Sequence, residues 1–350
     1  MSESTLYPKI RTKLKEIIHD LQLIHEFASE CPPPTKLMVT GTVKLHGTHA
    51  DILIYPDNTI VLQSRNCLNL SITADNHEFA ASMATKTAAL LSLRDRYYER
   101  SKRLFPKVVI DEHAPLILAG EWIGQNIQKG VALVHLSKRF VIVSASLNGG
   151  WEPDLLYAGL ESEADGIYNI SRAGFYHAAI DLADPEATEQ RLQGIAEEIA
   201  AECPFAKTFG VKGAGEGVVW KFDSFPHRER VWFKTKGGPF KPNYAPRPTK
   251  GPPSDKVLDE QSAQQKTAVD CAKAWCSEGR LEQAWDYLRE TGKERNIKGL
   301  GLFLKWIVED ILVEERWDME QLGVQPGLLK KAIADIAKPW YIGKSGIYAS

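Results

Sequence analysis

The chain has 350 residues, of which 43% are hydrophobic and 25% are charged, the balance of a soluble globular protein with room for two domains. Because 43 Lys and Arg stand against 45 Asp and Glu, the formal net charge is −2 and overall charge does not attract a polyanion. A nucleotide or nucleic acid would have to be bound by local clusters. No apolar run is long enough for a membrane span, so we expect no membrane partner.

The cysteines indicate a reducing compartment. They are five in number, an odd count, and they show neither metal-ligand spacing nor a partnering histidine pattern. The N-terminal residues 1–20 form an amphipathic stretch with several basic residues, without the apolar core of a signal peptide. We therefore expect an intracellular protein, with the cytoplasm or the nucleus as the favoured location.

Short apolar strands separated by turns predominate between residues 37 and 236, and helical patterns come between them. The strands are expected at residues 37–43, 50–55, 59–63, 116–122, 140–147, 217–222 and 230–234. The helices are expected at residues 9–29, 77–91 and 185–201. This pattern predicts an α+β fold with a large antiparallel-sheet component.

The sequence changes character after residue 236. Residues 237–254 hold too many prolines and glycines for a regular element, so we place a linker at residues 241–258. Apolar residues then recur at helical spacing, with glycines and a proline between the groups. We therefore expect a first domain over residues 1–240 and an all-α C-terminal domain over residues 259–350. A five-stranded oligonucleotide-binding barrel is not expected there.

Four lysines stand in short motifs that suit phosphate chemistry. Lys44 lies in Thr-Val-Lys-Leu-His-Gly-Thr, Lys221 ends Gly-Glu-Gly-Val-Val-Trp-Lys, and Lys234 and Lys236 lie in Phe-Lys-Thr-Lys-Gly. A lysine normally keeps its proton to about pH 10.4, so a nucleophilic lysine needs desolvation or cationic neighbours near pH 7. Alternate residues of a strand share a face, so Lys221, Lys234 and Lys236 are expected to face one cleft with Lys44. Three such lysines aimed at one point suggest that the ligand is a polyphosphate.

Two glutamates and an arginine complete the set. Glu121 lies in Leu-Ala-Gly-Glu-Trp-Ile-Gly and Glu216 lies between two glycines, where the backbone can approach a ligand closely. Arg65 follows the end of a predicted strand in Ser-Arg-Asn. Each of these motifs alone is found at least as often on a solvated strand face or edge as at a functional site. The prediction therefore depends on the order and spacing of the motifs.

Together, in this order, the five clusters resemble the motifs of the covalent nucleotidyltransferase superfamily, which includes polynucleotide ligases and mRNA-capping enzymes. The RNA ligase 2-like family is the more similar, because its lysine motif carries a histidine at the position of His46. Residues 120–129 and the C-terminal residues 328–340 are similar to the same family. The resemblance implies a nucleotidyltransferase domain with an ATP-grasp-like, antiparallel-sheet fold, followed by an all-α domain.

The resemblance also implies a role for each residue. Lys44 becomes the nucleophile that forms a lysyl-AMP bond, while Glu216 and Glu121 hold Mg²⁺ or Mn²⁺. Lys234 and Lys236 join Lys44 and Glu216 in catalysis, because they neutralise charge as pyrophosphate leaves. The residues expected against the nucleotide are Val43, Leu45, His46, Gly47, Arg65, Glu121, Val143 and Lys221.

Three positions depart from the family pattern. Val143 stands where an aromatic residue stacks on adenine, Ser144 replaces the acidic residue expected next, and His49 replaces an asparagine of the lysine motif. We therefore expect an aliphatic face against the purine, while the backbone of Val43 can still contact it.

The function implied by the resemblance is that of an ATP-dependent RNA ligase, which joins a 5′-phosphate to a 3′-hydroxyl through lysyl-AMP and RNA-adenylate. The C-terminal domain would engage the RNA, and we expect a monomer. Residues 228–250 hold seven Lys or Arg against one Glu, with four aromatic residues among them, and suit an RNA backbone. A nicked duplex, a hairpin and cleaved tRNA halves all stay open as the natural RNA.

Two alternatives remain beside this function. A DNA ligase or a GTP-dependent capping enzyme shares the five clusters, but it should carry a barrel domain where this chain has a helical pattern. A catalytically inactive RNA-binding module is a protein of a different class. The presence of every charged motif residue speaks against such a module.

Overall fold

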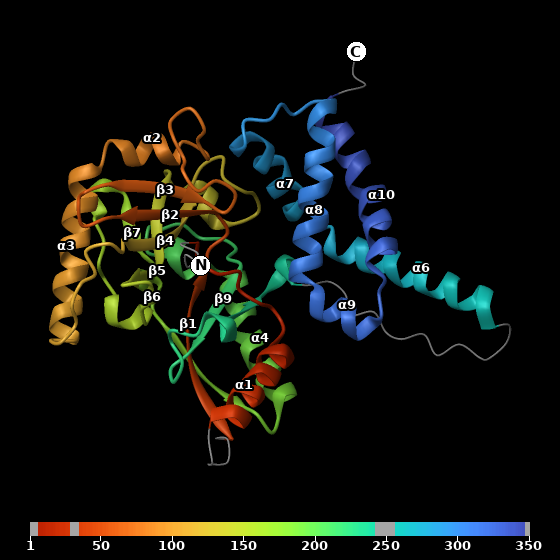
Figure 1. The fold of residues 1–350 in the computed structure, drawn as a ribbon, viewed down its shortest axis with the longest axis horizontal. Coiled ribbons are helices and arrows are strands. Elements are labelled where there is room, and N and C mark those ends of the chain that lie inside the picture. Colours follow the sequence, from red (N-terminus) through yellow and green to blue (C-terminus); the bar gives the residue numbers. More distant parts are fainter. Residues whose placement is uncertain (1–5, 29–34, 242–255, 347–350) are drawn as a thin grey trace. The chain divides into compact units, whose positions relative to one another are not determined.

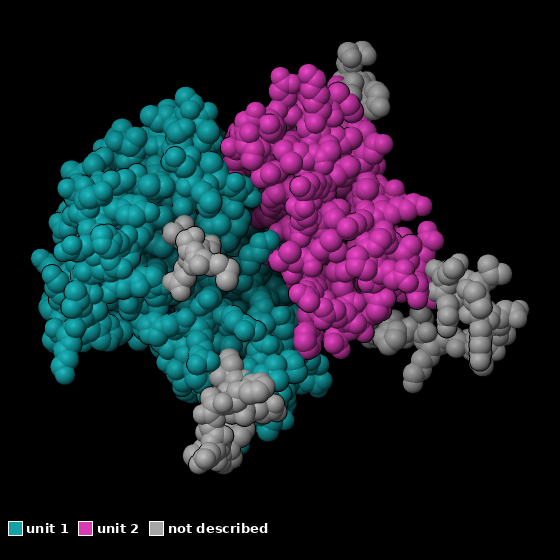
Figure 2. All heavy atoms as spheres, in the orientation of Figure 1, with its two compact units in different colours: residues 1–241 teal, residues 242–350 magenta. Residues whose placement is uncertain are grey.

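The structure, a computed structural model, describes residues 6–28, 35–241 and 256–346. It divides into two compact units, Met1–Lys241 and Pro242–Ser350 (Figure 2). Each unit has a hydrophobic core of its own. The linker expected at residues 241–258 falls for the most part outside the described residues.

The first unit contains two mainly antiparallel sheets (Figure 1). The four-stranded sheet has the order β10-β9-β1-β8, with β1 (Lys36–Lys44), β8 (Tyr176–Asp181), β9 (Gly217–Phe222) and β10 (Phe233–Lys236). The six-stranded sheet has the order β3-β2-β4-β5-β6, with β7 beside β5: β2 (Thr48–Ile54), β3 (Ile60–Ser64), β4 (Leu116–Ile123), β5 (Arg139–Leu147), β6 (Gly150–Trp151) and β7 (Ile167–Asn169). This is the α+β, antiparallel-sheet architecture that the sequence predicts.

Helices cover the outer face of each sheet. Against the four-stranded sheet lie α1 (Leu14–Ala28) and α4 (Pro185–Ala201), and short α5 (Pro204–Lys207) follows them in the chain. Against the six-stranded sheet lie α2 (Phe79–Ala84) and α3 (Thr87–Leu104) (Figure 1). The start of α4 is fixed by the Asp184 side chain, which accepts a hydrogen bond from the backbone N–H of Ala187. The inner faces of the two sheets are thus left for other contacts.

A small apolar cluster joins these inner faces. Leu53 and Ala119 of the six-stranded sheet contact Tyr7 and Trp232, which precedes β10. Polar and charged side chains follow along the same faces, next to this cluster. The inner faces of the two sheets therefore approach each other at this cluster, and the predicted site residues lie on these faces.

The sequence located most elements of this unit, and α4 and β9 have the expected bounds. The helix expected at residues 77–91 is two helices instead, because Lys86 leaves helical geometry between them. The strand expected from residue 230 begins at Phe233, because Glu229–Val231 forms a 3-10 turn. The strands β6, β7 and β8 were not expected, and the first two are too short to show alternation.

The second unit is helical over the described residues 256–346, as the sequence predicts. Its helices are α6 (Lys256–Trp275), α7 (Glu278–Glu290), α8 (Leu300–Glu314), α9 (Arg316–Leu322) and α10 (Pro326–Ser345). Ser277 caps α7 by accepting a hydrogen bond from the backbone N–H of Arg280. The buried side chains of Leu288, Phe303 and Tyr341 form the centre of its core. In the described parts of the chain, no helix is long and apolar enough to cross a membrane.

Candidate active site

The four predicted lysines lie on one face of the four-stranded sheet. Strand pairing sets Lys44 of β1 and Lys236 of β10 on the two sides of Gly217 in β9. Lys234 lies two residues before Lys236, and Lys221 lies four residues after Gly217. Directly paired residues, and every second residue along a strand, share a face. All four lysine side chains therefore leave the sheet on the same side.

Glu216 joins two of these lysines. One oxygen of its carboxylate lies 2.7 Å from Lys44 Nζ, and the other lies 2.9 Å from Lys236 Nζ. The oxygen that accepts from Lys44 is also 3.3 Å from His46 Nδ1. Only 1% of the Glu216 side chain is exposed, so its charge is balanced by protein groups and not by water. We call Glu216, Lys44, Lys236 and His46 the Glu216 group.

The electrostatics of the Glu216 group keep its carboxyl ionised. Burial favours the neutral acid, but Lys236, Lys44 and His46 outweigh burial and hold the pKa of Glu216 well below its usual value. The carboxylate is therefore charged at neutral pH, and it fixes two ammonium groups at the ends of two strands.

Glycines permit the close contacts around this group. A Cβ on Gly217 would lie 2.0 Å from the carbonyl oxygen of Thr235 in the neighbouring strand. A Cβ on Gly47 would lie 2.6 Å from the carbonyl oxygen of Trp122 and 3.1 Å from Glu121 Oε2. Both positions need glycine for this reason, and Gly47 lets the lysine motif pass directly beside Glu121.

Glu121 comes from the other sheet, where it stands opposite His49 in the pairing of β2 with β4. Burial raises the pKa of Glu121, while Lys44 and His49 oppose this rise and Glu216 adds to it. The two glutamates and Lys44 thus share one electrostatic environment, although they belong to different sheets.

Glu121 and Glu216 are also the predicted metal ligands. Within the described ranges, no group of three or more His, Cys, Asp or Glu side chains could hold a metal ion. Two carboxylates nevertheless suit Mg²⁺ or Mn²⁺ that keeps several waters and takes further oxygens from substrate phosphates. The donor set therefore fits only a hydrated ion bound together with a nucleotide. At Glu216 such an ion would displace Lys44 or Lys236, whose ammonium groups contact the two carboxylate oxygens.

Lys221 has a carboxylate of its own. Its Nζ lies 2.8 Å from Asp154 and 2.9 Å from Ser144 Oγ. Lys234 is also buried on this face, and its backbone N–H donates to the carbonyl oxygen of Arg11 over 2.7 Å. The predicted lysines therefore divide, with Lys44 and Lys236 on Glu216 and Lys221 on Asp154.

Asp154 was missed in the sequence. It opens the 3-10 turn Asp154–Tyr157, which belongs to none of the strand motifs. The available signal was indirect: Ser144 lacks the acid that the resemblance leads one to expect, and a buried lysine such as Lys221 rarely lacks a partner. A carboxylate from another segment was therefore to be expected, but the sequence did not say which.

Arg65 contacts the N-terminal segment. Its Nη1 donates to the carbonyl oxygen of Tyr7 over 2.5 Å. The ring of Tyr7 is almost fully buried, stacks at 6.0 Å on the ring of His49, and lies 5.7 Å from that of Trp232. Tyr7 therefore occupies part of the space between the sheets, beside Arg65, a role that no sequence motif indicated.

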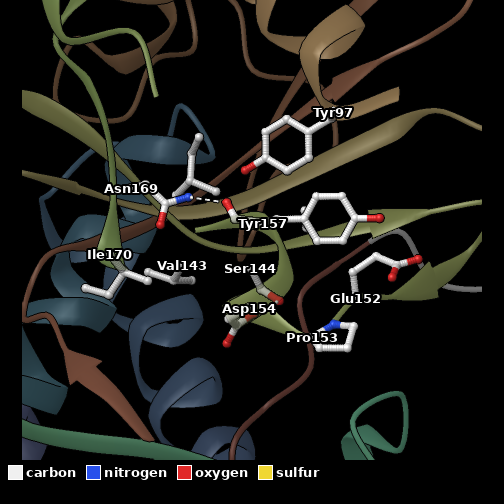
Figure 3. A pocket seen from close by; sticks show the side chains of 11 residues that line it. Tyr97, Val143, Ser144, Glu152, Pro153, Asp154, Tyr157, Asn169 and Ile170 are labelled. Carbon is white, nitrogen blue, oxygen red and sulfur yellow. Dashed lines mark hydrogen bonds between the residues drawn. The ribbon is translucent and has the colours of Figure 1, made fainter. Parts of the chain in front are cut away.

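Val143 lies in a β-bulge. The pairing of β4 with β5 shifts between Ala119 and Gly120, which leaves Val143 as the extra residue. Its side chain packs against the cluster that includes Tyr7 and lines a small cavity with Ser144 (Figure 3). An aliphatic residue thus occupies this position, next to aromatic side chains from elsewhere in the chain.

The remaining residues of the lysine motif point in different directions. The side chains of Val43 and Leu45 are buried in the core, so only their backbone can face a nucleotide. His49 Nε2 lies 2.9 Å from Asp51 Oδ2, and Asp51 is fully buried. The histidine that replaces the family's asparagine is thus held by a carboxylate two residues further on.

Comparison with known proteins identifies the family. The RNA ligase family model matches residues 38–236. Among solved structures, Naegleria gruberi RNA ligase with PPi is 15% identical with a TM-score of 0.41, and a mutant of that ligase with ATP and Mn is 16% identical with a TM-score of 0.40. Each comparison covers 67% of this chain and 57% of the other chain, so this chain spans little more than half the length of those ligases. No curated protein matches the sequence.

The family match extends over more than half of the chain. It begins six residues before Lys44 and ends at Lys236, so that it contains all five motif clusters. The residues that meet in the Glu216 group all lie inside it. The chain belongs to the RNA ligase family.

Proposed function

We propose that this protein is an ATP-dependent RNA ligase, which joins a 5′-phosphate end to a 3′-hydroxyl end. The observation that carries the proposal is the Glu216 group, in which one buried carboxylate lies 2.7 Å from Lys44 Nζ and 2.9 Å from Lys236 Nζ. An amine, a second cation and a carboxylate at one point are the groups that nucleotidyl transfer onto lysine requires. Membership of the family supports the same function.

The reaction proceeds in three steps. Lys44 Nζ first releases its ammonium proton to solvent and then attacks the α-phosphorus of ATP as the neutral amine. A nitrogen–phosphorus bond forms, the nitrogen loses a second proton, and pyrophosphate leaves. The 5′-phosphate of RNA then attacks the same phosphorus and displaces Lys44, which gives RNA-adenylate. Finally, the 3′-hydroxyl of RNA attacks the activated 5′-phosphate, and AMP leaves. The covalent intermediate divides one difficult condensation into easier exchanges.

The residues of the site have separate tasks. Glu216 holds the Lys44 amine at a fixed point at the end of β1, which limits the reorganisation needed for attack. Lys236 and Lys234 balance the charge that develops on pyrophosphate. The nucleotide is contacted by the remaining predicted residues. These are Arg65, Glu121, Lys221, Val143, His46, Gly47 and the backbone of Val43 and Leu45. Glu121 and Glu216 would hold Mg²⁺ or Mn²⁺, which when bound polarises the phosphate oxygens.

The two parts of the chain divide the work. Residues 1–240 form the adenylyltransferase domain, and residues 259–350 engage the RNA of a monomeric enzyme. The linker expected at residues 241–258 ends before Lys256, because α6 begins there. The exposed side chains of Arg228 and Arg230 support an RNA path beside the last lysine motif. The four described cysteines are all free, which supports a reducing compartment such as the cytoplasm or the nucleus.

A labelling experiment tests the proposal. The protein is incubated with magnesium and either α-labelled ATP or α-labelled GTP, and it is then denatured. We expect the ATP label to stay on the protein and to be lost in Lys44→Ala, because that change removes the nucleophile from a partly exposed position without opening the core. Lys36→Ala, at the other and exposed end of β1, is the matched control and should keep the label.

The other outcomes identify the alternatives. Label from GTP would indicate a capping enzyme, and label from neither nucleotide would indicate a binding module. An ATP-labelled protein that seals nicked DNA but not 5′-phosphate RNA would indicate a DNA ligase. Label retained on Lys44→Ala would contradict the assignment of the nucleophile.

A further inference from the structure

Four side chains enclose the ammonium of Lys221. Its Nζ lies 2.8 Å from the carboxylate of Asp154 and 2.9 Å from Ser144 Oγ. The ring centre of Trp232 is 4.0 Å from Nζ and that of Tyr7 is 5.8 Å away. The side chains of Lys221 and Asp154 are only 7% and 8% exposed. The positive charge is therefore held and balanced inside the protein, on the same sheet face as Lys44.

The carboxylate reaches Lys221 from outside the strand motifs. Asp154 lies in the turn after β6, and Ser144 of β5 donates a hydrogen bond to it over 2.9 Å (Figure 3). Ser144 is also the position at which the resemblance leads us to expect an acid. Ser144 gives Lys221 only a neutral hydroxyl, whereas Asp154 gives it a negative charge. The acid missing from β5 is thus supplied by a residue ten positions further along the chain.

We propose that Asp154 is a positioning residue, which together with Ser144 holds the Lys221 ammonium at the inner face where the nucleotide binds. The inference rests on the proposed function, in which Lys221 contacts the nucleotide. Asp154 acts on the nucleotide through Lys221.

The physical reason is that a buried ammonium needs a counter-charge. Burial lowers the pKa of Lys221, and Asp154 opposes this fall. Asparagine at position 154 would keep the shape and one acceptor oxygen but remove the charge. Lys221 would then lose its proton or turn away from its present place. In both cases a cation disappears from the space between the sheets, and anionic ATP binds less tightly.

The test measures how lysyl-AMP formation depends on ATP concentration in full-length variants. Asp154→Asn should raise KM for ATP on the order of tenfold or more, the scale of one hydrogen bond to a charged group, while kcat changes by less than about threefold. Glu152→Gln is the matched control, because Glu152 lines the same cavity two residues away. Its KM should equal that of the unchanged protein. Thermal melts establish that each variant is folded.

Two further variants separate positioning from a purely structural role. Ser144→Asp combined with Asp154→Asn moves the carboxylate onto β5, and KM should return to within about threefold of the original value. In a Lys221→Gln background, Asp154→Asn should have no further effect on KM, because its influence passes through Lys221.

Three results would overturn the inference. The first is an unchanged KM for ATP in Asp154→Asn. The second is a folded Ser144→Asp, Asp154→Asn double variant whose KM stays raised. The third is an Asp154→Asn change that raises KM as much in the Lys221→Gln background as in the unchanged protein. The proposed function is judged separately, because its failure appears as the absence of lysyl-AMP in the unchanged protein.

Discussion

Lys44 Nζ donates a hydrogen bond to Glu216 Oε2 over 2.7 Å, although 172 positions separate the two residues in the chain. The contact exists because β1 and β9 pair antiparallel with Lys44 opposite Gly217, which brings the residue before β9 to the end of β1. Lys236 occupies the matching position on the other side of β9. The geometry of the Glu216 group is therefore set by strand register, and the group should be rigid.

Removal of Glu216 or of Lys236 from this group should slow adenylation. We expect Glu216→Ala and Lys236→Ala each to reduce the single-turnover rate of lysyl-AMP formation by roughly 10²-fold or more, the scale for one preorganised electrostatic group. The ion pair of Glu202 with Lys207 provides matched controls, since alanine at either position removes the same kind of charge from an exposed side chain. Near-normal rates in the Glu216 and Lys236 variants would leave these residues with a structural role only.

The base pocket can be tested at Val143. If the purine packs on this residue, Val143→Phe should be tolerated and should tighten ATP binding, because a well-placed aromatic face adds about 0.5–1.5 kcal/mol. Overpacking against the neighbouring aromatic cluster would instead cost about 1–3 kcal/mol of stability. Titration of ATP against both forms, with thermal melts alongside, distinguishes the two effects. A loss of binding in a protein of unchanged stability would mean that another residue covers the purine.

Glu152 should make folding stability depend on pH. Burial raises the pKa of this carboxyl above its usual value of 4.5, and His227 opposes the rise. Among the described residues, one of its buried oxygens has no hydrogen-bond partner. An acid with a raised pKa in the folded state destabilises the protein as pH rises past the unfolded value.

Replacement by the neutral amide should remove this pH dependence. Glu152→Gln should therefore melt at a higher temperature than the unchanged protein at pH 7, and the difference should shrink as the pH falls from 7 and be largely gone below about 4.5. Scanning calorimetry between pH 4 and pH 7 measures both melting temperatures. A difference that stays constant over this range would show that the ionisation of Glu152 does not affect folding.

The division of labour between the units predicts the behaviour of a fragment. A chain that ends near Lys250 contains all five motif clusters and the complete core of the first unit, so it should still form lysyl-AMP. It should fail to join 5′-phosphate RNA to a 3′-hydroxyl end, because the helical unit is absent. Circular dichroism and a cooperative melt establish that the fragment is folded. A folded fragment that forms no adduct would show that the second unit contributes to the first step.

The sequence by itself determined the kinds of elements and the kinds of chemistry. Apolar alternation indicated the strands, and a proline in the first turn marked the start of α4, because these signals depend on neighbouring residues only. The period of two along β10 was enough to place Lys234 and Lys236 on one sheet face, whereas the pairing of β10 with β9 decides that Lys221 shares that face. The order of the motifs then indicated the family, which the family match over residues 38–236 confirms.

Only the tertiary structure decided which of these groups meet. Whether a lysine pairs with Glu216 or with Asp154 depends on strand register and on a turn outside the motifs, and neither has a local signal. The bulge at Val143 likewise arises from a shift in the pairing of β4 with β5. Contacts between residues far apart in the chain are fixed by how whole sheets pair and pack. The sequence therefore indicated which residue types form the site, but it did not indicate which residues contact one another.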